Sequence, residues 1–184
     1  MGITFGGGDT NKRALEYMEK KYGEKFEYIK PGGGGYLTNV RTILVSCESL
    51  PGKEIVLVIL KDGKGERYKD NYKDNYFAGQ VEDFVVNIAK KYFDDVTFEV
   101  SISRLSTYPE DDPMPTFEDY ISNKYISGSM DINDTSEETM REFFDELMTM
   151  GLYFSIDIDI PSTGAGYYSA YYDDNTEYRF YRRH

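Results

Sequence analysis

The chain has 184 residues, and its 21 Lys and Arg against 33 Asp and Glu give a formal net charge of −12. Nucleic-acid binding and docking on anionic membranes both depend on clustered cations, so this balance argues against either partner. The single Cys47 excludes an internal disulfide and a cysteine-based zinc cluster. The single His184 stands last in the sequence, where chains usually fray, which argues against a His-dependent triad or a multi-His metal site.

The first residues, 1–8, are rich in Gly and lack the basic and long apolar segments of a signal peptide. Two interpretations stay open: an unstructured start, or a flexible tether that remained after a lipoprotein signal and its anchoring Cys were removed. The chain contains no run of the ~18 consecutive apolar residues that a membrane span needs. We therefore expect no transmembrane segment.

The first half of the chain predicts one helix followed by three strands. Asp9 or Thr10 can cap a helix that ends at Tyr22, because Gly23 follows as a stop signal. The strands are expected over residues 24–30, 38–47 and 54–61. The last of these is apolar on both faces, which predicts a central strand covered on both sides.

The rest of the chain predicts three helices and four strands. A tandem Lys-Asp-Asn-Tyr repeat over residues 69–76 precedes a helix that runs to about Tyr92. The later helices begin at Thr116 and near Thr135, the second with the capping-box partner Glu138, and the Ser-Gly-Ser sequence at 127–129 predicts a loop between them. The strands are expected over residues 96–103, 152–160, 167–173 and 176–182.

The predicted order is αβββ-αβ-αα-βββ. Hairpin-length connections favour antiparallel pairs, so we expect an α+β fold in which helices pack on an antiparallel β-sheet. Residues 9–184 would form a single domain. Its possible halves are 9–105 and 116–184, joined by the Pro- and acid-rich linker 106–115.

An acidic stretch in the second half partly matches a calcium-binding loop. Asp131, Asn133, Thr135 and Glu142 occupy positions 1, 3, 5 and 12 of that template. The loop needs Gly for a sharp turn where this chain has Ser136, and a helix is expected to begin there. The alternative is a helix N-terminus whose acids complement the helix dipole. We expect no bound metal and no other cofactor.

Asp157 and Asp159 alternate with Ile and should share one strand face, about 7 Å apart. Carboxylates at such a distance can perform glycoside hydrolysis, so a carboxylate-dependent hydrolase of surface glycans is one alternative function. Catalytic pairs usually come from two elements that flank a cleft, whereas alternating Asp on a wet sheet face serves solubility. We therefore expect a protein that is not an enzyme and assign no catalytic residue.

The chain contains 18 Tyr and no Trp, and many of the Tyr lie near its end. If residues 174–175 form a hairpin turn, Tyr168 lies opposite Tyr181. By the same register Tyr171 faces Tyr178, so both sheet faces carry aromatic side chains. Packing explains one aromatic face, and a second one suits recognition of a partner. The candidate ligand-binding residues are Tyr36, Tyr167, Tyr168, Tyr171, Tyr172, Tyr178 and Arg179.

Short motifs in the first half carry a family resemblance. They are Ala14-Leu15-Glu16-Tyr17-Met18 with Lys21-Tyr22-Gly23, Cys47-Glu48-Ser49-Leu50-Pro51-Gly52, and the two Asp-Asn-Tyr copies before the second helix. Through them the stretch from Ala14 to about Val100 resembles a family of small uncharacterised proteins of Gram-positive gut bacteria, often predicted lipoproteins. The resemblance implies a cell-surface location and no assigned activity. It does not cover the Tyr-rich second half.

These observations lead to one expectation and two alternatives. We expect an extracellular, membrane-tethered binding module without catalytic activity, whose ligand is an unknown protein, peptide or glycan. Its oligomeric state stays open. The alternatives are the glycan hydrolase and an acidic cytoplasmic inhibitor or nucleic-acid mimic, which the net charge alone suggests.

Overall fold

The computed structural model describes residues 7–33, 39–103, 108–109, 112–122, 124–133, 135–171 and 177–183. The chain divides into two compact units, each described here by itself. Unit 1 comprises Met1–Tyr76 and Ser103–Met114, and unit 2 comprises Phe77–Ile102 and Pro115–His184. Each unit combines a sheet with helices, which confirms the predicted α+β class. Within the described ranges, no helix has the length and apolar character of a membrane span.

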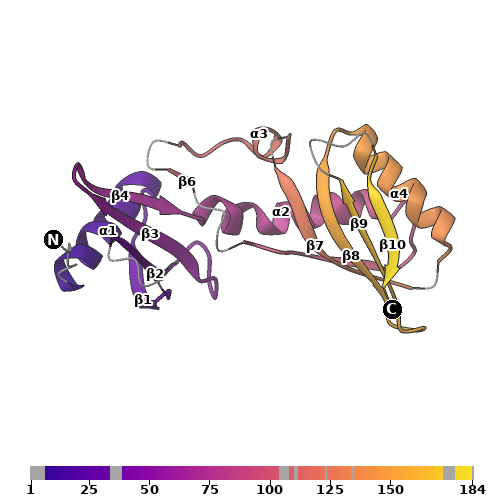
Figure 1. Cartoon of the computed structure of the whole chain (residues 1–184), viewed down its shortest axis with the longest axis horizontal. Coiled ribbons are helices and arrows are strands. Elements are labelled where there is room, and N and C mark those ends of the chain that lie inside the picture. Colours follow the sequence, from indigo (N-terminus) through magenta and orange to yellow (C-terminus); the bar gives the residue numbers. More distant parts are fainter. Residues whose placement is uncertain are drawn as a thin grey trace. The chain divides into compact units, whose positions relative to one another are not determined.

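Unit 1 contains an antiparallel sheet in the order β1-β2-β3-β4-β6 (Figure 1). Its elements are α1 (Gly7–Tyr22), β1 (Phe26–Pro31), β2 (Val40–Cys47), β3 (Ile55–Asp62), β4 (Gly65–Asp70) and β6 (Tyr108–Pro109). The apolar strand β3 is central, as predicted. Leu57 and Ile59 belong to the core beside α1, and Val56 on the other face is also buried, whereas Val58 is partly exposed.

Helix α1 ends where the sequence predicts and begins earlier. Its first residue is Gly7, so the expected cap at Asp9 or Thr10 is wrong. Thr10 is instead a buried residue inside the helix. At the other end Gly23 has φ +74°, a left-handed conformation that Gly adopts without strain. The helix therefore stops after Tyr22.

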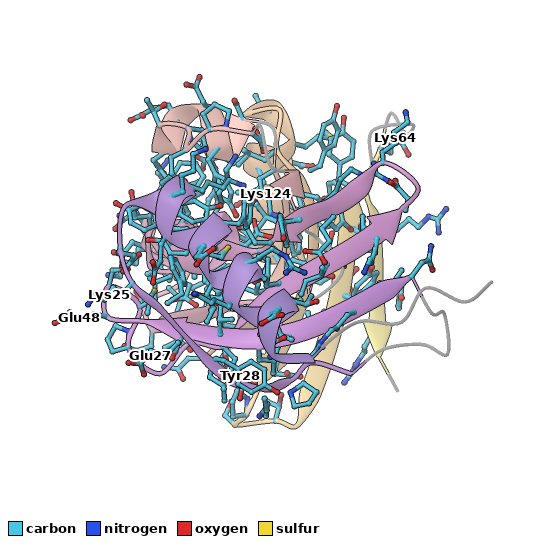
Figure 2. All side chains as sticks on the ribbon, turned by 90° about the vertical axis from the view of Figure 1, so that its left-hand side faces the viewer. Lys25, Glu27, Tyr28, Glu48, Lys64 and Lys124 are labelled. Atoms are coloured by element: carbon cyan, nitrogen blue, oxygen red, sulfur yellow. The ribbon has the colours of Figure 1, made fainter. Side chains whose placement is uncertain are left out.

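The apolar side of α1 packs on the sheet of unit 1. Ala14 and Met18 are fully buried in the same core as the inward residues of β2 and β3. Figure 2 looks onto this unit and shows α1 crossing the strands, with Lys25, Glu27 and Glu48 pointing outward. The unit thus has an apolar cluster between α1 and the sheet, with charged side chains on its surface.

Strand β4 has no counterpart among the sequence-based expectations, because its residues are mostly charged. It pairs antiparallel with β3. Tyr68 at its centre stacks on Tyr17 of α1 with ring centroids 4.8 Å apart. Glu66 accepts two hydrogen bonds from the Arg13 guanidinium, at 2.9 and 2.7 Å, which hold the pKa of Glu66 at about 2. Contacts with a distant helix therefore hold a strand that lacks an alternating apolar pattern.

Part of the predicted linker is also a strand. Within 106–115, the short β6 pairs with β4, so that Tyr108 lies opposite Asp70 and Pro109 opposite Lys69. The linker residues 106–107 and 110–111 lie outside the described ones. A single domain over 9–184 stays a prediction.

Unit 2 contains a mixed sheet in the order β10-β9-β8-β7-β5 (Figure 1). Its elements are α2 (Tyr72–Ala89), of which the part from Phe77 onward belongs to this unit, β5 (Val96–Val100), α3 (Phe117–Ser122), β7 (Tyr125–Ile132), α4 (Glu137–Thr149), β8 (Tyr153–Ile160), β9 (Ala165–Tyr171) and β10 (Arg179–Arg183). The alternation predicted for β8 is confirmed, because Phe154, Ile156, Ile158 and Ile160 are buried and the residues between them are not.

Strand β7 corrects the loop predicted at 127–129. It pairs parallel with β8 and antiparallel with β5, so the two expected helices are separated by an interior strand. Gly128 belongs to this strand because the Phe98 ring of β5 lies over it. A Cβ at Gly128 would stand 2.4 Å from Phe98 Cζ and 2.5 Å from the Glu99 carbonyl oxygen. The Gly that indicated a loop is therefore required by packing.

The core of unit 2 lies between one sheet face and the helices α2 and α4. Val85 of α2 and Phe143 of α4 are fully buried in it. Phe144 of α4 stacks on Phe154 of β8 with ring centroids 5.3 Å apart. Because Phe154 and the buried Ile residues of β8 share one face, both helices cover that same face.

The predicted register of the closing hairpin is confirmed. Strands β9 and β10 pair antiparallel with Tyr168 opposite Tyr181. The predicted turn at 174–175 lies outside the described residues. Tyr178 precedes the first residue of β10, so its expected pairing with Tyr171 is not part of the described ladder.

Candidate binding face of the second unit

The sheet of unit 2 has a second face, opposite to α2 and α4, and its side chains are polar and aromatic. We call it the open face. It is formed by alternate residues of all five strands: Thr97, Glu99, Ser127, Ser129, Asp131, Ser155, Asp157, Asp159, Tyr168, Arg179 and Tyr181. All of them are exposed or half-buried. A polar face of this kind needs no helix to cover it.

The strand registers arrange these side chains in rows across the sheet. In the central row, Glu99 of β5 lies opposite Ser129 of β7, which lies beside Asp157 of β8. The row continues with Tyr168 of β9 and Tyr181 of β10. The open face therefore changes from carboxylates and hydroxyls to aromatic rings across the five strands.

Tyr168 and Tyr181 form an aromatic pair at the β9–β10 side of this face. Their ring centroids are 5.1 Å apart, and the Tyr168 hydroxyl lies 2.9 Å from the Ser155 hydroxyl on β8. Tyr181 is 53% exposed. A ring pair held at one end and open at the other offers apolar area together with a polar tip, the combination that recognition surfaces favour.

Charges of opposite sign lie on different strands of the open face. Asp131 of β7 stands next to Asp159 of β8, and Asp157 lies two residues before Asp159 on β8. Arg179 is exposed on β10, two residues from Tyr181 along the same strand. The carboxylates of Asp157 and Asp159 share one face, as predicted. A ligand lying across the five strands in the central row would meet acids first and then the rings, with Arg179 beside Tyr181 on β10.

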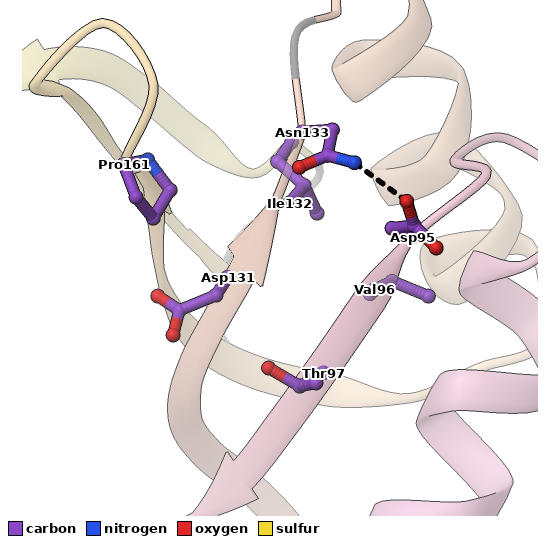
Figure 3. A pocket seen from close by; sticks show the side chains of 7 residues that line it. All are labelled: Asp95, Val96, Thr97, Asp131, Ile132, Asn133 and Pro161. Carbon is purple, nitrogen blue, oxygen red and sulfur yellow. Dashed lines mark hydrogen bonds between the residues drawn. The ribbon is translucent and has the colours of Figure 1, made fainter.

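A shallow pocket opens at one edge of the sheet in unit 2 (Figure 3). Its volume is about 250 Å³, and Thr97, Asp131, Asp95, Asn133 and the apolar residues Val96, Ile132 and Pro161 line it. The Asn133 side-chain amide donates a hydrogen bond of 2.7 Å to the Asp95 carboxylate. Asp157 and Asp159 are not in this lining, so the predicted carboxylate pair does not meet in the pocket.

The four residues of the calcium-loop template occupy different elements. Asp131 lies in β7, Asn133 binds Asp95 after that strand, and Glu142 lies on α4. Among the described residues, no three His, Cys, Asp or Glu side chains gather closely enough to hold a metal ion. This placement agrees with the helix N-terminus interpretation.

The helix cap itself corrects the predicted capping box of Thr135 and Glu138. The N-cap of α4 is Ser136, whose side chain accepts a hydrogen bond of 3.0 Å from the Thr139 backbone N–H. Thr135 and Ser136 are both residue types that cap helices, and the cap lies at Ser136, one residue later than the predicted capping box places it. Glu137 and Glu138 then occupy the first turn, where the dipole favours acids.

Three of the predicted tyrosines lie on the helix side of the sheet. Tyr171 and Tyr178 contact Phe154 at 6.0 and 6.2 Å between ring centroids. Tyr167 stacks on Phe180 at 5.7 Å. These side chains pack against the core of unit 2. The tertiary structure thus gives them a packing role, and a binding role for them stays a prediction.

The remaining candidates divide between the open face and the undescribed residues. Tyr168 and Arg179 belong to the open face, whereas Tyr36 and Tyr172 lie outside the described residues. Tyr181 was placed opposite Tyr168 by the hairpin register but not counted as a site residue. The signal that could have selected it is its alternation with Phe180, which packs into the core.

Unit 1 contains a second cluster of ionisable side chains, centred on Asp70 of the first Lys-Asp-Asn-Tyr copy. Asp70 is fully buried and accepts hydrogen bonds from Tyr17 and Lys21 at 3.0 Å each and from Tyr22 at 2.6 Å. The Tyr72 backbone N–H donates a further one at 3.1 Å. Four donors around one carboxylate satisfy it without water.

This cluster is structural rather than catalytic. Burial, followed by the charge of Asp70, raises the pKa of Tyr22 far above its ordinary range, so Tyr22 stays protonated and only donates. The Lys21 side chain is 9% exposed and Asp70 is not exposed at all. A substrate could not reach these groups, and the cluster ties α1 to β4.

The tandem repeat has different environments in its two copies. Tyr72 of the first copy is 5% exposed and Tyr76 of the second is 45% exposed. Lys73 is buried and forms an ion pair of 2.6 Å with Asp112. Asn71 accepts a hydrogen bond of 2.7 Å from the Val56 backbone N–H, which extends the attachment of the chain to β3. The repeat therefore serves the fold of unit 1.

Comparisons with known proteins give a limited result. No family model and no curated protein matches this chain. Among solved structures, a DUF5037 family protein from Ruminococcus gnavus is similar with a TM-score of 0.47 and 14% identity, over 82% of this chain and 74% of that one. This similarity carries no argument about activity.

Proposed function

We propose that the protein is a binding module without catalytic activity, and that the open face of unit 2 is its recognition surface. The observation that carries the proposal is the Tyr168–Tyr181 pair, which stands on the uncovered side of the sheet with Tyr181 53% exposed. Tyr167, Tyr171 and Tyr178 pack toward the helices. The pair lies outside the core of unit 2, which is on the other side of the sheet.

The charges around the pair favour a peptide or protein segment as the ligand. Asp157 and Asp159 lie on β8, next to the strand of Tyr168, and Arg179 lies on β10, two residues from Tyr181. A polypeptide can present both signs of charge next to apolar groups, whereas a neutral glycan presents neither. The protein, peptide or glycan expected from sequence thus narrows to a polypeptide in this proposal.

A cell-surface location belongs to the same proposal. It is supported by the sequence resemblance to predicted lipoproteins, whereas Gly7 and Gly8 of the tether predicted over residues 1–8 belong to α1. The gene upstream of Gly2 tests it: a cysteine codon at the end of a secretory signal is expected there. An upstream sequence that encodes a further domain instead of a secretory signal would contradict the cell-surface location. It would not bear on the proposal that the open face binds a ligand.

An array of peptides and glycans tests the recognition surface. We expect the unmodified protein to retain a set of peptides that Tyr181→Ser loses. The matched control is Tyr28→Ser, which removes a similarly exposed ring, 40% exposed, from β1 of unit 1. Equal binding by the Tyr181→Ser and unmodified proteins would contradict the proposal, and retention of glycans alone would contradict the choice of a polypeptide.

A further inference from the structure

The strand β10 is an edge of the sheet in unit 2 and carries an unusual charge. Among the described residues its one strand neighbour is β9, so the other side of its backbone presents donors and acceptors without a strand partner. Three of its five residues are Arg, namely Arg179, Arg182 and Arg183. The whole chain has a net charge of −12, so this edge is a local cationic site on an acidic protein.

The strand is fixed from the helix side and accessible from the other. Phe180 packs against Tyr167 at 5.7 Å and Phe144 at 5.9 Å between ring centroids. The Arg182 guanidinium lies 6.0 Å from the Tyr167 ring centroid. Arg179 and Tyr181 alternate with these residues and are exposed on the open face. The edge is therefore held in an extended form before any partner arrives, which lowers the entropic cost of pairing.

We propose that an extended acidic segment of another protein adds to β10 as a sixth strand. This inference rests on the proposed binding function and names the partner class and the binding mode. Main-chain hydrogen bonds to β10 would supply affinity, and acidic side chains at alternate positions, which share one face of the added strand, would meet Arg179 on the open face.

The same charge argues against a second copy of this chain as the occupant. Antiparallel pairing of two β10 strands about Tyr181 would set Arg179 of each copy opposite Arg183 of the other. Like charges directly opposite each other destabilise a strand pair. An acidic segment in the same place would be attracted by the Arg side chains instead of repelled.

Three synthetic peptides test the proposal on the whole protein. The probe alternates Glu and Val and is one residue longer than β10 at each end. The second peptide replaces Glu by Lys, and the third keeps Glu and Val but is N-methylated at alternate backbone nitrogens, which removes the pairing donors. Binding is measured by fluorescence anisotropy of labelled peptides, and amide exchange is followed over residues 179–183.

We expect the Glu peptide to bind and to slow exchange of the β10 amides. The Lys peptide and the N-methylated peptide should each bind at least about tenfold more weakly. Arg179→Glu should weaken the Glu peptide by a similar factor. Lys12→Glu makes the same charge change on α1 of unit 1, at a side chain that is 78% exposed, and should have no such effect.

The failures of the two proposals are distinguishable. If the N-methylated peptide binds as well as the probe and Tyr181→Ser weakens both, the ligand docks on the open face by its side chains. Strand addition is then wrong and the binding function stands. If no peptide binds and the array shows no dependence on Tyr181, both are wrong. Equal binding of the Lys peptide would overturn the acidic partner.

Discussion

In unit 1 a carboxylate lies in the core, whereas in unit 2 the carboxylates stand on the solvent side of the sheet. Asp70 is surrounded by Tyr17, Lys21 and Tyr22, and their hydrogen bonds hold a helix to a strand that has little apolar character of its own. Unit 2 buries mainly aromatic and aliphatic side chains between its helices and one sheet face, and none of its buried residues among those described is charged. Because one face of this sheet already supplies the core, its other face can carry polar side chains.

The comparison separates two ways in which a sequence rich in Tyr and acids can fold. Where a strand lacks apolar residues, the acids become part of the interior and need donors. Where a strand alternates strictly, as β8 does, the acids stay outside. A binding surface is therefore available on unit 2 and not at the Asp70 cluster. The predictions below test this difference, from the largest expected effect to the smallest.

Removing the buried charge should damage unit 1 most. Asp70→Asn leaves Lys21 as a buried cation without its carboxylate, and we expect a loss of about 3–5 kcal/mol in the free energy of unfolding. Chemical denaturation with amide exchange over α1 measures it. The double variant Asp70→Asn with Lys21→Met removes the uncompensated charge and should recover part of the loss. A loss below about 1 kcal/mol for Asp70→Asn would show that the network is not central.

Adding one methyl group to β7 should damage unit 2. Gly128→Ala places a Cβ against the Phe98 ring and the Glu99 carbonyl, and a fixed backbone atom cannot move aside cheaply. We expect a loss of about 1–3 kcal/mol in thermal or chemical denaturation. The control Gly79→Ala meets no atom within 4 Å and lies inside α2, so it should gain about 0.5–1 kcal/mol. A neutral Gly128→Ala would contradict the packing argument for β7.

Alkaline pH should weaken unit 1 through its buried tyrosines. Burial and then the neighbouring Glu66 raise the pKa of Tyr68 to about 12, and burial with the carboxylates of Asp70 and Glu24 raises the pKa of Tyr22 and Tyr72 as well. Unfolded Tyr ionises near 10, so this stability is complete below pH 10 and is lost as pH rises through 12. Denaturation midpoints measured across this range should fall.

A variant tests which tyrosines cause that fall. Tyr22→Phe removes one phenol from the Asp70 cluster and should flatten the loss between pH 10 and 12. Tyr125→Phe removes a phenol from the start of β7, outside that cluster, and serves as the control. Equal slopes in both variants would assign the alkaline loss to other groups.

The smallest effect concerns a hydroxyl in the apolar core of unit 2. Ser169 is fully buried on the helix side of β9, opposite Ile156, and its hydroxyl has no hydrogen-bond partner among the residues that the structure describes. Ser169→Ala should leave the unfolding free energy unchanged or raise it by up to about 1 kcal/mol. Ser155→Ala removes a hydroxyl that meets Tyr168 and should lower it slightly. A clear loss for Ser169→Ala would reveal a partner for that hydroxyl.

The fold was predictable where local signals agreed and was missed where they conflicted. Gly23 ended α1, and alternation placed the inward residues of β8. The strands β4 and β7 were missed because one is charged and the other contains Ser-Gly-Ser, and both are held by neighbours far away in the sequence. The parallel pairing of β7 and β8 followed from that strand and could not be predicted without it.

For the candidate site, the sequence predicted the pairing of Tyr168 with Tyr181 but not which tyrosines face outward. The hairpin register is a local property of two neighbouring strands and their spacing. The sequence pattern favours Tyr167, Tyr171 and Tyr178 as binding residues as much as Tyr168. The structure packs these three side chains against the core of unit 2. Arg179 was predicted as a candidate binding residue and lies on the open face.

By itself the sequence determined the fold class, the end of the first helix and the alternation of the last strands, because each depends on residues close together along the chain. Only the tertiary structure decided that Asp70 is buried and Tyr181 exposed, and that β10 forms an edge. Burial and strand order depend on which distant helices and strands pack together, and their contacts determine which side chains meet solvent.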